Sequence, residues 1–369
     1  MQESLSFNYK KNFNKEIKIY FSQDSAKIVA DICGYLGTDR IFIVADNGFK
    51  NNHSHRLKQN LSIKFPTKVL NITAKEIKKK LSTLHNLSEK IIANGATNKS
   101  VIISLGGGLV GNIAGMLAGL LFRGVPLIHI PTTVLSQADS ATDVKQSVNC
   151  ENIKNGMGIY YPPVAVIIDV NLLKTLPERE VRSGLAEIIK HALAQDEDLL
   201  RYLYRKVPTQ KINAPTLERI IARTISLKIE HWKNTPDMWS EEAVKKPERL
   251  THLGHTTGKI LEILQQDKIT HGEAISHGMI IEAIASKKLG IGNEQIITEM
   301  KKVFGRFQLL YPLKKNINSS SVIYGLYGNK NKQKNPIFAL LKNLGVPKTV
   351  STSINPDILK EALLEYGIK

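Results

Sequence analysis

One glycine-rich stretch limits the possible folds of this chain more than any other segment. Residues 101–105 (VIISL) form an apolar run typical of a buried strand, and three glycines at 106–108 follow as a tight turn. Residues 109–121 (LVGNIAGMLAGLL) then have the small, apolar pattern of a helix packed closely on a sheet. The glycines at 106, 108 and 111 fit G-x-G-x-x-G, a turn that lets a phosphate group approach the helix amides. Tight packing alone explains the same glycines, so the motif by itself leaves nucleotide binding open.

The first half of the chain alternates short apolar runs with helical patterns. The runs predict strands at 41–46, 67–72, 101–105, 127–132 and 164–170. Strands that alternate with helices are typical of an α/β domain with a mostly parallel sheet. We therefore expect a Rossmann-like α/β domain over residues 1–172.

From about Asn171 the second half shows helical spacing instead. Helices are expected at 178–193, 214–231, 255–265, 273–289, 293–306 and 355–366. The polar stretches 232–248 and 314–336 are expected to be irregular, and the strand signals end. Residues 173–369 are therefore predicted to form a second, all-α domain.

Composition excludes several classes of protein. The longest apolar helix, 109–122, falls short of the roughly 20 residues that cross a bilayer, and the first residues lack the apolar core of a signal peptide. We therefore expect a cytoplasmic protein with no membrane partner. Cys33 and Cys150 are the two cysteines and form no CxxC pair, so neither a disulfide framework nor a cysteine-rich zinc site is expected.

The net charge of +18 is compatible with nucleic-acid binding, but its distribution is not typical of it. The lysines are scattered along the chain, and no RNP-like aromatic motif or compact basic arm accompanies them. We therefore expect no nucleic-acid partner. A positive field would still help to capture a phosphorylated small molecule.

A series of motifs in one order resembles a known family. These are GGGLVGNIAG, FRGVPLIHIPTT, DS followed by Lys145, KN at 154–155, LKTLPEREVRSGLAEIIK, GHTTG and HGEA. Together they are similar to the sugar phosphate cyclases of the dehydroquinate synthase superfamily, and the resemblance spans most of the chain. Asn112 in GNIAG, KQSVN from Lys145 and YYPP at 160–163 look more like the inosose synthases than the dehydroquinate synthases. The latter usually carry Asp in GDLAG and GGK before the lysine.

The resemblance implies one divalent metal ion. Glu187 in GLAEIIK, His255 in GHTTG and His271 in HGEA stand at the positions of the family's ligands. Catalytic zinc sites take three such nitrogen or oxygen ligands and keep one position open. Zinc or cobalt fits this set. Spacing alone would equally allow each histidine to be a helix cap or a core residue.

NAD is the cofactor that the resemblance implies. Asp46 closes the strand IFIVAD, where a carboxylate can accept hydrogen bonds from ribose hydroxyls or cap the next segment. The other positions that match the family's cofactor contacts are Glu76, Lys79, Gly107, Gly108, Asn112, Thr132, Thr133, Lys154 and Thr175. In the lysine-rich run KEIKKK, a solvated helix face is the competing interpretation for Glu76 and Lys79.

The resemblance also implies a set of groups around the substrate. The catalytic positions are Lys145, Asn155, Lys190, Lys228 and Asp139, of which Asp139 would orient Lys145 or a substrate hydroxyl. Converging cations and an amide would neutralise a phosphate and align it as a leaving group. Three further substrate-binding positions are His252, Lys259 and Lys330. Each lysine taken alone could equally be a surface residue.

Several positions depart from the family pattern. Where dehydroquinate synthases have R-x-x-x-N-x-G-H-T-x-x-H, this chain has ERLTHLGHTTGK, with Glu248, His252 and Lys259 at the arginine, asparagine and second histidine. Arg249 lies one residue out of register. Inosose synthases normally have Glu, in EYGHT, where this chain has His252, and Asp143 in TDVK is also unusual. These changes concern the substrate, not the type of reaction.

The implied activity is a redox-neutral cyclisation of a sugar phosphate. A ring hydroxyl is transiently oxidised, phosphate leaves by β-elimination, the ketone is reduced again, and ring opening with aldol closure gives a carbocycle. Glucose 6-phosphate, leading to 2-deoxy-scyllo-inosose, is the expected substrate of a homodimeric lyase. The alternatives are a 3-dehydroquinate synthase or a sedoheptulose 7-phosphate cyclase and, from other classes, a metal-dependent polyol dehydrogenase or an inactive binding homologue.

Overall fold

The computed structural model describes residues 16–48, 53–151, 153–233, 250–265, 268–314, 317–328, 336–346 and 349–369. The chain folds into two compact units. The first unit comprises the chain up to Pro131 together with Asp143–Ile168, and the second comprises Thr132–Thr142 and Asp169–Lys369. The chain therefore passes from one unit to the other three times.

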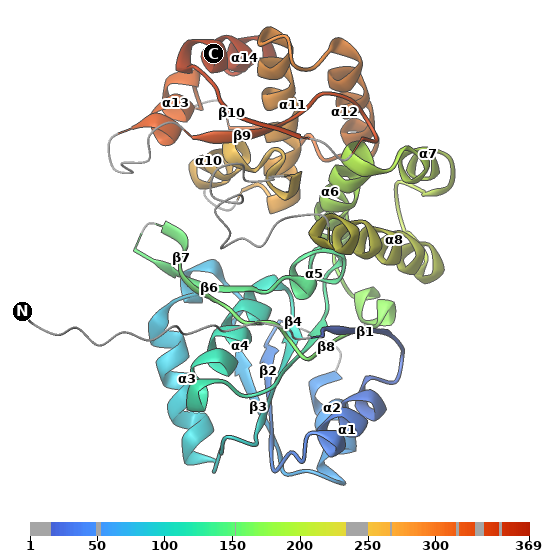
Figure 1. Ribbon diagram of the computed structural model, residues 1–369, viewed down its shortest axis with the longest axis vertical. Coiled ribbons are helices and arrows are strands. Elements are labelled where there is room, and N and C mark those ends of the chain that lie inside the picture. Colours follow the sequence, from blue (N-terminus) through green and yellow to red (C-terminus); the bar gives the residue numbers. More distant parts are fainter. Residues whose placement is uncertain are drawn as a thin grey trace, which may run out of the picture. The chain divides into compact units, whose positions relative to one another are not determined.

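The first unit is built on a parallel sheet of six strands. In spatial order these are β1 (Lys18–Phe21), β8 (Ala165–Ile168), β5 (Leu127–Pro131), β4 (Val101–Gly106), β2 (Ile41–Asp46) and β3 (Thr67–Ile72). The central strands β2, β4 and β5 are almost entirely buried, because helices cover both faces. Figure 1 shows α1 (Ser25–Tyr35) and α2 (His53–Ser62) on one side, and α3 (Leu81–Ala93) and α4 (Gly108–Leu120) on the other. The five predicted strands are confirmed; the four-residue β1 was not predicted.

An antiparallel hairpin, β6 (Lys145–Cys150) and β7 (Ile153–Tyr160), explains the small residues of α4. A Cβ added to Gly115 would lie 2.2 Å from Gln146 Oε1, and one added to Gly119 would lie 2.2 Å from Ile159 Cδ1. Both distances are too short for any side chain, so these glycines let the hairpin approach the helix. The prediction that α4 packs closely is confirmed, while the hairpin was not predicted.

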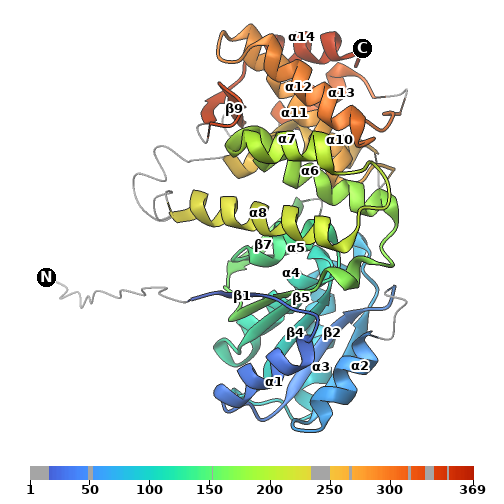
Figure 2. The same ribbon diagram turned by 90° about the vertical axis from the view of Figure 1, so that its right-hand side faces the viewer.

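The second unit is mainly helical. Its helices are α5 (Val134–Ala138), α6 (Glu178–Gln195), α7 (Glu197–Lys206), α8 (Ala214–Lys233), α10 (His255–Gln265), α11 (His271–Lys288), α12 (Glu294–Arg306), α13 (Ser319–Tyr327) and α14 (Pro356–Tyr366). Helix α11 packs against α6, α10, α12 and α14 and is buried on nearly every face, including its polar residues Glu273, His277 and Glu282. Figure 2 shows α8 running beside α6.

Short 3-10 turns link the regular elements. They are η1 (Glu76–Lys78), η2 (Leu121–Arg123), η3 (Ser140–Thr142), η4 (Val170–Leu173) and η5 (Leu250–His252).

The predicted fold class is confirmed, with two local corrections in the second unit. The strands β9 (Ile337–Leu341) and β10 (Thr349–Ser353) form an antiparallel pair, so the expectation that the strand signals end near residue 171 was wrong. Helix α13 lies within 314–336, which was expected to be irregular. Most of the predicted loop 232–248 lies outside the described residues. The single domain division at residue 172 stays a prediction.

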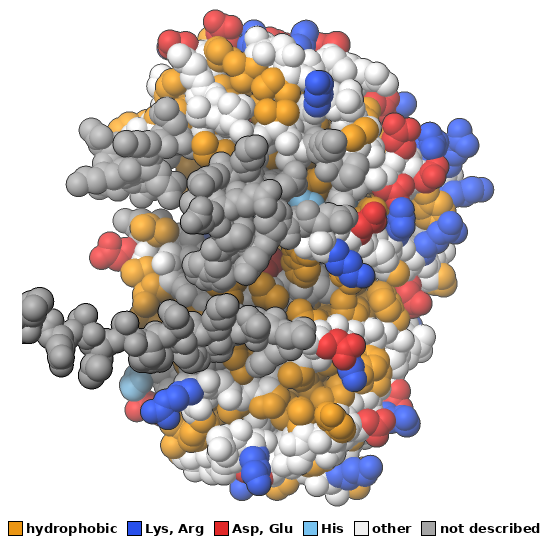
Figure 3. All heavy atoms as spheres, viewed as in Figure 1, with side chains coloured by type: hydrophobic (Ala, Val, Ile, Leu, Met, Phe, Trp, Pro, Cys, Tyr) orange, Lys and Arg blue, Asp and Glu red, His pale blue; other side chains and the backbone are white. Residues whose placement is uncertain are grey.

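Two further observations concern membrane-spanning helices and the distribution of charge on the surface. Among these residues, no helix combines the length and the hydropathy needed to cross a membrane. On the face shown in Figure 3, the Lys and Arg side chains are interspersed with acidic and apolar ones.

Candidate functional sites

Three helices of the second unit bring the predicted metal ligands together. Glu187 lies in the middle of α6, and His255 and His271 are the first residues of α10 and α11. One ligand atom from each residue lies within 4.8 Å of the others. The Nε2 atoms of both histidines lie 3.4 Å from Glu187 Oε1. His255 and His271 follow Glu187 by 68 and 84 positions in the chain, yet both reach its buried carboxylate.

The hydrogen bonds of this cluster fit a bound cation. His255 Nδ1–H donates to the Leu253 carbonyl at 3.1 Å, so Nε2 of a neutral His255 presents a lone pair to the carboxylate. Burial would lower the pKa of His271, but hydrogen bonds with Glu187 and Glu262 outweigh it and raise the pKa to about 9. The site therefore favours positive charge beside Glu187, which a divalent ion held by two imidazoles and a carboxylate would supply.

Two carboxylates that the sequence analysis did not identify support His271. Glu262 Oε2, on α10, lies 3.6 Å from His271 Nδ1, the arrangement that orients a ligating histidine. Glu273 joins Thr270 in a capping box at the start of α11. Its carboxylate also accepts hydrogen bonds from Arg179 Nε at 2.8 Å and Nη2 at 2.7 Å. The pattern T-x-x-E before α11 was the available sequence signal for Glu273, whereas Glu262 needs the fold.

Lys190 adjoins the metal cluster. One turn after Glu187 on α6, its Nζ forms an ion pair with Glu187 Oε2 and donates to the Thr251 carbonyl at 3.0 Å. Burial alone would raise the pKa of Glu187, but Lys190 and the two imidazoles outweigh it and hold the pKa well below its usual value. Lys190 is itself almost fully buried, so the surface interpretation of this lysine is wrong.

A second buried ion pair joins Lys228 on α8 to Asp139. Lys228 Nζ donates to the Asp139 carbonyl at 2.6 Å and to its Oδ1 at 2.7 Å, and lies 4.8 Å from the centre of the Trp232 ring. Burial would raise the pKa of Asp139, but the Lys228 charge outweighs it and lowers the pKa to about 2. Both residues belong to the second unit, and Asp139 pairs there with Lys228. Its predicted role in orienting Lys145 or a substrate hydroxyl stays a prediction.

The glycine turn and Asp46 lie at the carboxyl ends of neighbouring strands in the first unit. Gly107 is the N-cap of α4 and provides no side-chain cap, so the first amides of the helix have no side-chain acceptor at that position. Asp46 Oδ1 accepts hydrogen bonds from Gly48 N at 3.0 Å and Ala74 N at 3.3 Å. Asp46 thus orders the segments that follow β2 and β3; its proposed contact with NAD stays a prediction.

A network of amides connects several predicted cofactor residues of the first unit. Asn112 accepts from Ser147 N at 2.8 Å and donates to the Gly108 carbonyl at 2.8 Å. Ser147 Oγ and Lys79 Nζ both donate to Asn155 Oδ1. A continuous series of hydrogen bonds therefore runs from Gly108 in the glycine turn to Lys79. Lys79 is 6% exposed, so a solvated helix face is the wrong interpretation for it.

Asn149 completes this network and was not identified from the sequence. Its Nδ2 donates to Glu76 Oε1 at 2.7 Å, and its Oδ1 accepts from Asn155 N at 2.9 Å. Asn155 adopts a left-handed backbone with φ of 56°, which asparagine tolerates better than most residues. Asn149 stands within the motif KQSVN, so a sequence signal was present, but its partner Glu76 lies 73 residues earlier in the chain and could not be inferred.

The remaining predicted residues of the hairpin lie on its strands. Lys145 is exposed at the start of β6, opposite Tyr160, and its backbone N–H donates to Asp143 Oδ1 at 3.0 Å. The unusual Asp143 therefore shapes the turn that leads into the hairpin. Lys154 is half-buried on β7.

The threonines Thr132, Thr133 and Thr175 belong to the second unit. Thr132 is buried, and Thr133 caps α5 by accepting from Ser136 N at 3.1 Å. Thr175 lies between Lys174 and Leu176, which line a cavity of about 520 Å³.

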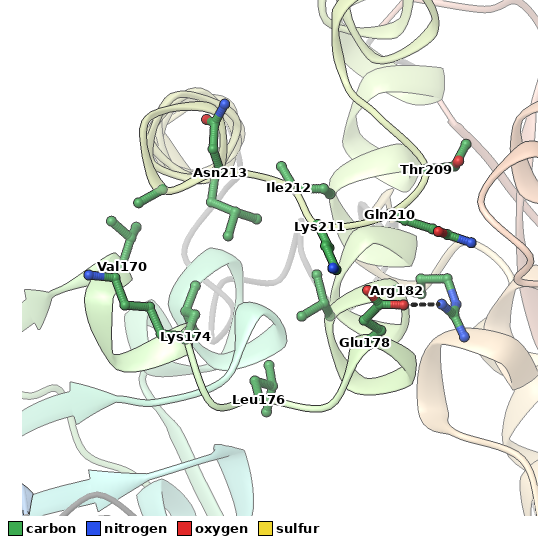
Figure 4. A pocket seen from close by; sticks show the side chains of 14 residues that line it. Val170, Lys174, Leu176, Glu178, Arg182, Thr209, Gln210, Lys211, Ile212 and Asn213 are labelled. Carbon is green, nitrogen blue, oxygen red and sulfur yellow. Dashed lines mark ion pairs between the residues drawn. The ribbon is translucent and has the colours of Figure 1, made fainter.

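This cavity carries both charged and apolar side chains. Figure 4 shows Glu178 beside Arg182, with an ion pair of 3.8 Å, and Lys211 pointing toward them. None of the three metal candidates lines it.

The three substrate-binding candidates have different outcomes. His252 is half-buried, with its ring centre 6.4 Å from that of His255. Lys259 is exposed on α10. Lys330 lies outside the described residues, as do Glu248 and Arg249.

Comparison with known proteins agrees with this architecture. The 3-dehydroquinate synthase N-terminal model matches residues 69–183, and the C-terminal model matches residues 184–333. The chain is 32% identical over 339 residues to a 2-deoxy-scyllo-inosose synthase of Niallia circulans, covering 89% of this chain and 90% of that protein. It is 31% identical over 350 residues to a 3-dehydroquinate synthase of Dehalococcoides mccartyi, covering 94% and 95%.

A solved structure is similar over nearly the whole chain. It is a 2-deoxy-scyllo-inosose synthase complexed with carbaglucose-6-phosphate, NAD+ and Co2+, with a TM-score of 0.84, 30% identity, and coverage of 94% of this chain and 96% of that one. Together these matches define an enzyme with an α/β unit and a helical unit. The chain belongs to the 3-dehydroquinate synthase family, and the resemblance inferred from its motifs is confirmed.

Proposed function

We propose that this enzyme is an NAD- and metal-dependent sugar phosphate cyclase that converts glucose 6-phosphate to 2-deoxy-scyllo-inosose with release of phosphate. The observation that carries the proposal is the convergence of Glu187, His255 and His271 beside the buried Lys190. The relative with carbaglucose-6-phosphate, NAD+ and Co2+ supports both cofactors and the class of substrate. Residues 1–172 would bind NAD, and residues 173–369 the metal and much of the substrate.

The chain's own residues would position the sugar phosphate. When bound, the metal would acidify a substrate hydroxyl, and NAD would accept and return a hydride. Among the described residues, Lys190 Nζ contacts Glu187 and the Thr251 carbonyl, so the third of its N–H groups can serve a ligand oxygen. Lys145, Asn155 and Lys228 would bind the phosphate as its charge increases during elimination. The substrate's own phosphate can take the proton next to the transient ketone, so no separate side-chain base is required.

The choice of sugar follows from the departures around the GHT motif. The arginine of the dehydroquinate synthases is replaced by Glu248, so a carboxylated heptulosonate would lose its counter-charge. A buried carboxylate without a partner costs several kcal/mol. Asn112 and KQSVN also favour the inosose synthase pattern. His252, Lys259 and Lys330 would contact the remaining substrate hydroxyls.

One assay separates the candidate functions. Phosphate release is measured on glucose 6-phosphate, a carboxylated heptulosonate phosphate and sedoheptulose 7-phosphate, and each product is identified by mass spectrometry. We expect turnover with glucose 6-phosphate and no net NADH. Dehydroquinate as the main product would contradict the substrate assignment, and stoichiometric NADH would identify a polyol dehydrogenase. An enzyme that fails to bind NAD, or that fails to bind a divalent ion, would be identified as an inactive homologue.

We also propose that the enzyme is a homodimer, as the family resemblance implies. Light scattering coupled to size-exclusion chromatography should give twice the 41.1 kDa mass of one chain. A mass of one chain across the concentrations used for the assay would contradict this.

A further inference from the structure

A fully buried carboxylate lies behind the metal cluster, where the proposed reaction does not use it. Glu282 is on α11, 11 residues after His271, and is 0% exposed. Its Oε2 accepts from Gly254 N at 2.9 Å, and its Oε1 accepts from Thr257 N at 2.8 Å. These two amides flank His255, so both oxygens of one carboxylate hold the backbone around that ligand.

The first amides of a helix have no partner within the helix, and the positive end of the helix dipole attracts an anion. Such a cap usually comes from the residue just before the helix. At α10 it comes from the neighbouring helix α11 instead. The Glu282 cap therefore ties the start of α10, which bears His255, to the body of α11, the helix whose first residue is His271.

Close packing leaves little room for this arrangement to shift. Gly254 has a φ of 73°, and a Cβ added to it would lie 2.3 Å from Met279 Cγ. A Cβ added to Gly278 would lie 2.1 Å from the Gly254 carbonyl oxygen. The His255 ring is fixed from its other side by its Nδ1–H bond to Leu253. The imidazole is therefore oriented through the backbone on which it stands.

We infer that Glu282 is a positioning residue, which sets the backbone of His255 so that its Nε2 faces the same point as His271 and Glu187. This rests on the proposed metal site and adds a residue that acts on the metal through His255. Outer residues that orient metal ligands contribute roughly 10- to 100-fold to metal affinity.

The test compares Glu282→Gln and Glu282→Asp with the unchanged enzyme. Glutamine keeps the shape but has one carbonyl oxygen for two N–H donors, while aspartate keeps both oxygens one methylene further away. Co2+ affinity is measured by competition with a chelating dye, and the visible spectrum of bound Co2+ reports ligand geometry. Ser286→Ala, at another buried polar residue of α11, is the matched control.

We expect Glu282→Gln to bind Co2+ about 10- to 100-fold more weakly with an altered spectrum, while Ser286→Ala retains both. Affinity and spectrum equal to those of the unchanged enzyme would overturn the inference. If Glu282→Gln does not fold, Glu282→Asp decides by the same two measurements. If the unchanged enzyme itself binds no Co2+, and His271→Ala does not differ from it, the proposed metal site fails instead.

Discussion

The two units of this enzyme organise their polar residues in opposite ways. In the first unit, the neutral side chains of Asn112, Ser147, Asn149 and Asn155 form a partly exposed network that the charged ends of Lys79 and Glu76 join. In the second, two ion pairs and two imidazoles gather in the interior, on helices α6, α8, α10 and α11 and on Asp139 at the end of α5. The first arrangement fixes backbone shape, and the second holds charge away from water.

This difference predicts how sensitive each unit is to change. A neutral hydrogen bond contributes about 1 kcal/mol net, because water replaces it in the unfolded chain. Removing one partner of a buried ionic group leaves a charge without compensation, which costs about 3–5 kcal/mol. Substitutions in the ionic cluster should therefore have the larger effects.

The largest effect is expected for His271→Ala. Loss of one of three ligands should release the metal and lower turnover by about 10³-fold or more, since a metal supplies several kcal/mol of transition-state stabilisation. Phosphate release and metal content measure this, and zinc or cobalt should restore chelated wild-type enzyme but not the variant. His277→Gln, at another buried histidine of α11, controls for the loss of an imidazole. Full activity of His271→Ala after exhaustive chelation would remove the metal assignment.

Lys145→Ala tests whether a charged residue of the first unit affects turnover as strongly as the residues of the ionic cluster in the second unit. If Lys145 binds the departing phosphate, turnover should fall by about 10²- to 10³-fold while NAD affinity stays nearly unchanged. Lys68→Ala, at an exposed lysine on β3, is the control. Near-normal turnover would make Lys145 a surface residue, and loss of NAD binding would make it a cofactor residue.

A pH titration can reveal the one strongly perturbed imidazole within the sheet of the first unit. His129 on β5 is buried beside Ser104 Oγ at 2.6 Å, and burial lowers its pKa from 6.5 to about 4. The unfolded chain takes up a proton below pH 6.5, whereas the folded one does so only near pH 4. His129 therefore leaves the free energy of unfolding unchanged above pH 6.5 and lowers it by about 3 kcal/mol at pH 4.

Hydrogen exchange of the β4 and β5 amides between pH 7 and 4, corrected for intrinsic rates, measures this loss locally. His129→Gln should remove most of the pH dependence. An unchanged slope in that variant would show that another group controls the acid sensitivity of the sheet.

The smallest effect is expected for Asn149→Ala. It removes the link from Glu76 to the backbone of Asn155, and we expect about tenfold weaker NAD binding with turnover at saturating NAD preserved. Isothermal titration measures the affinity, and Asn71→Ala on the exposed side of β3 is the control. A loss of turnover as large as that of His271→Ala would contradict the contrast between the two units.

The sequence was most informative where neighbours in the chain are also neighbours in space. Five strands of the sheet, the helix after the glycine turn and the start of α10 at His255 were predicted, because local periodicity determines them. Helix α11 was expected to begin at 273, two residues after its observed start at His271. Glu262, Glu282 and Asn149 were missed, since each acts on residues brought near only by the fold. The β9–β10 pair was missed because short strands in a helical region carry a weak local signal.

The threefold crossing of the chain between the units bears on how the enzyme is synthesised. Thr132–Thr142 leaves the ribosome between strands of the first unit, but its helix α5 packs against α6 and α8 of the second. The charge of Asp139 is compensated by Lys228, which is synthesised 89 residues later in the chain. A fragment ending at residue 172 would thus leave Asp139 without Lys228, whereas the nascent chain can fold its sheet first and pack this segment last.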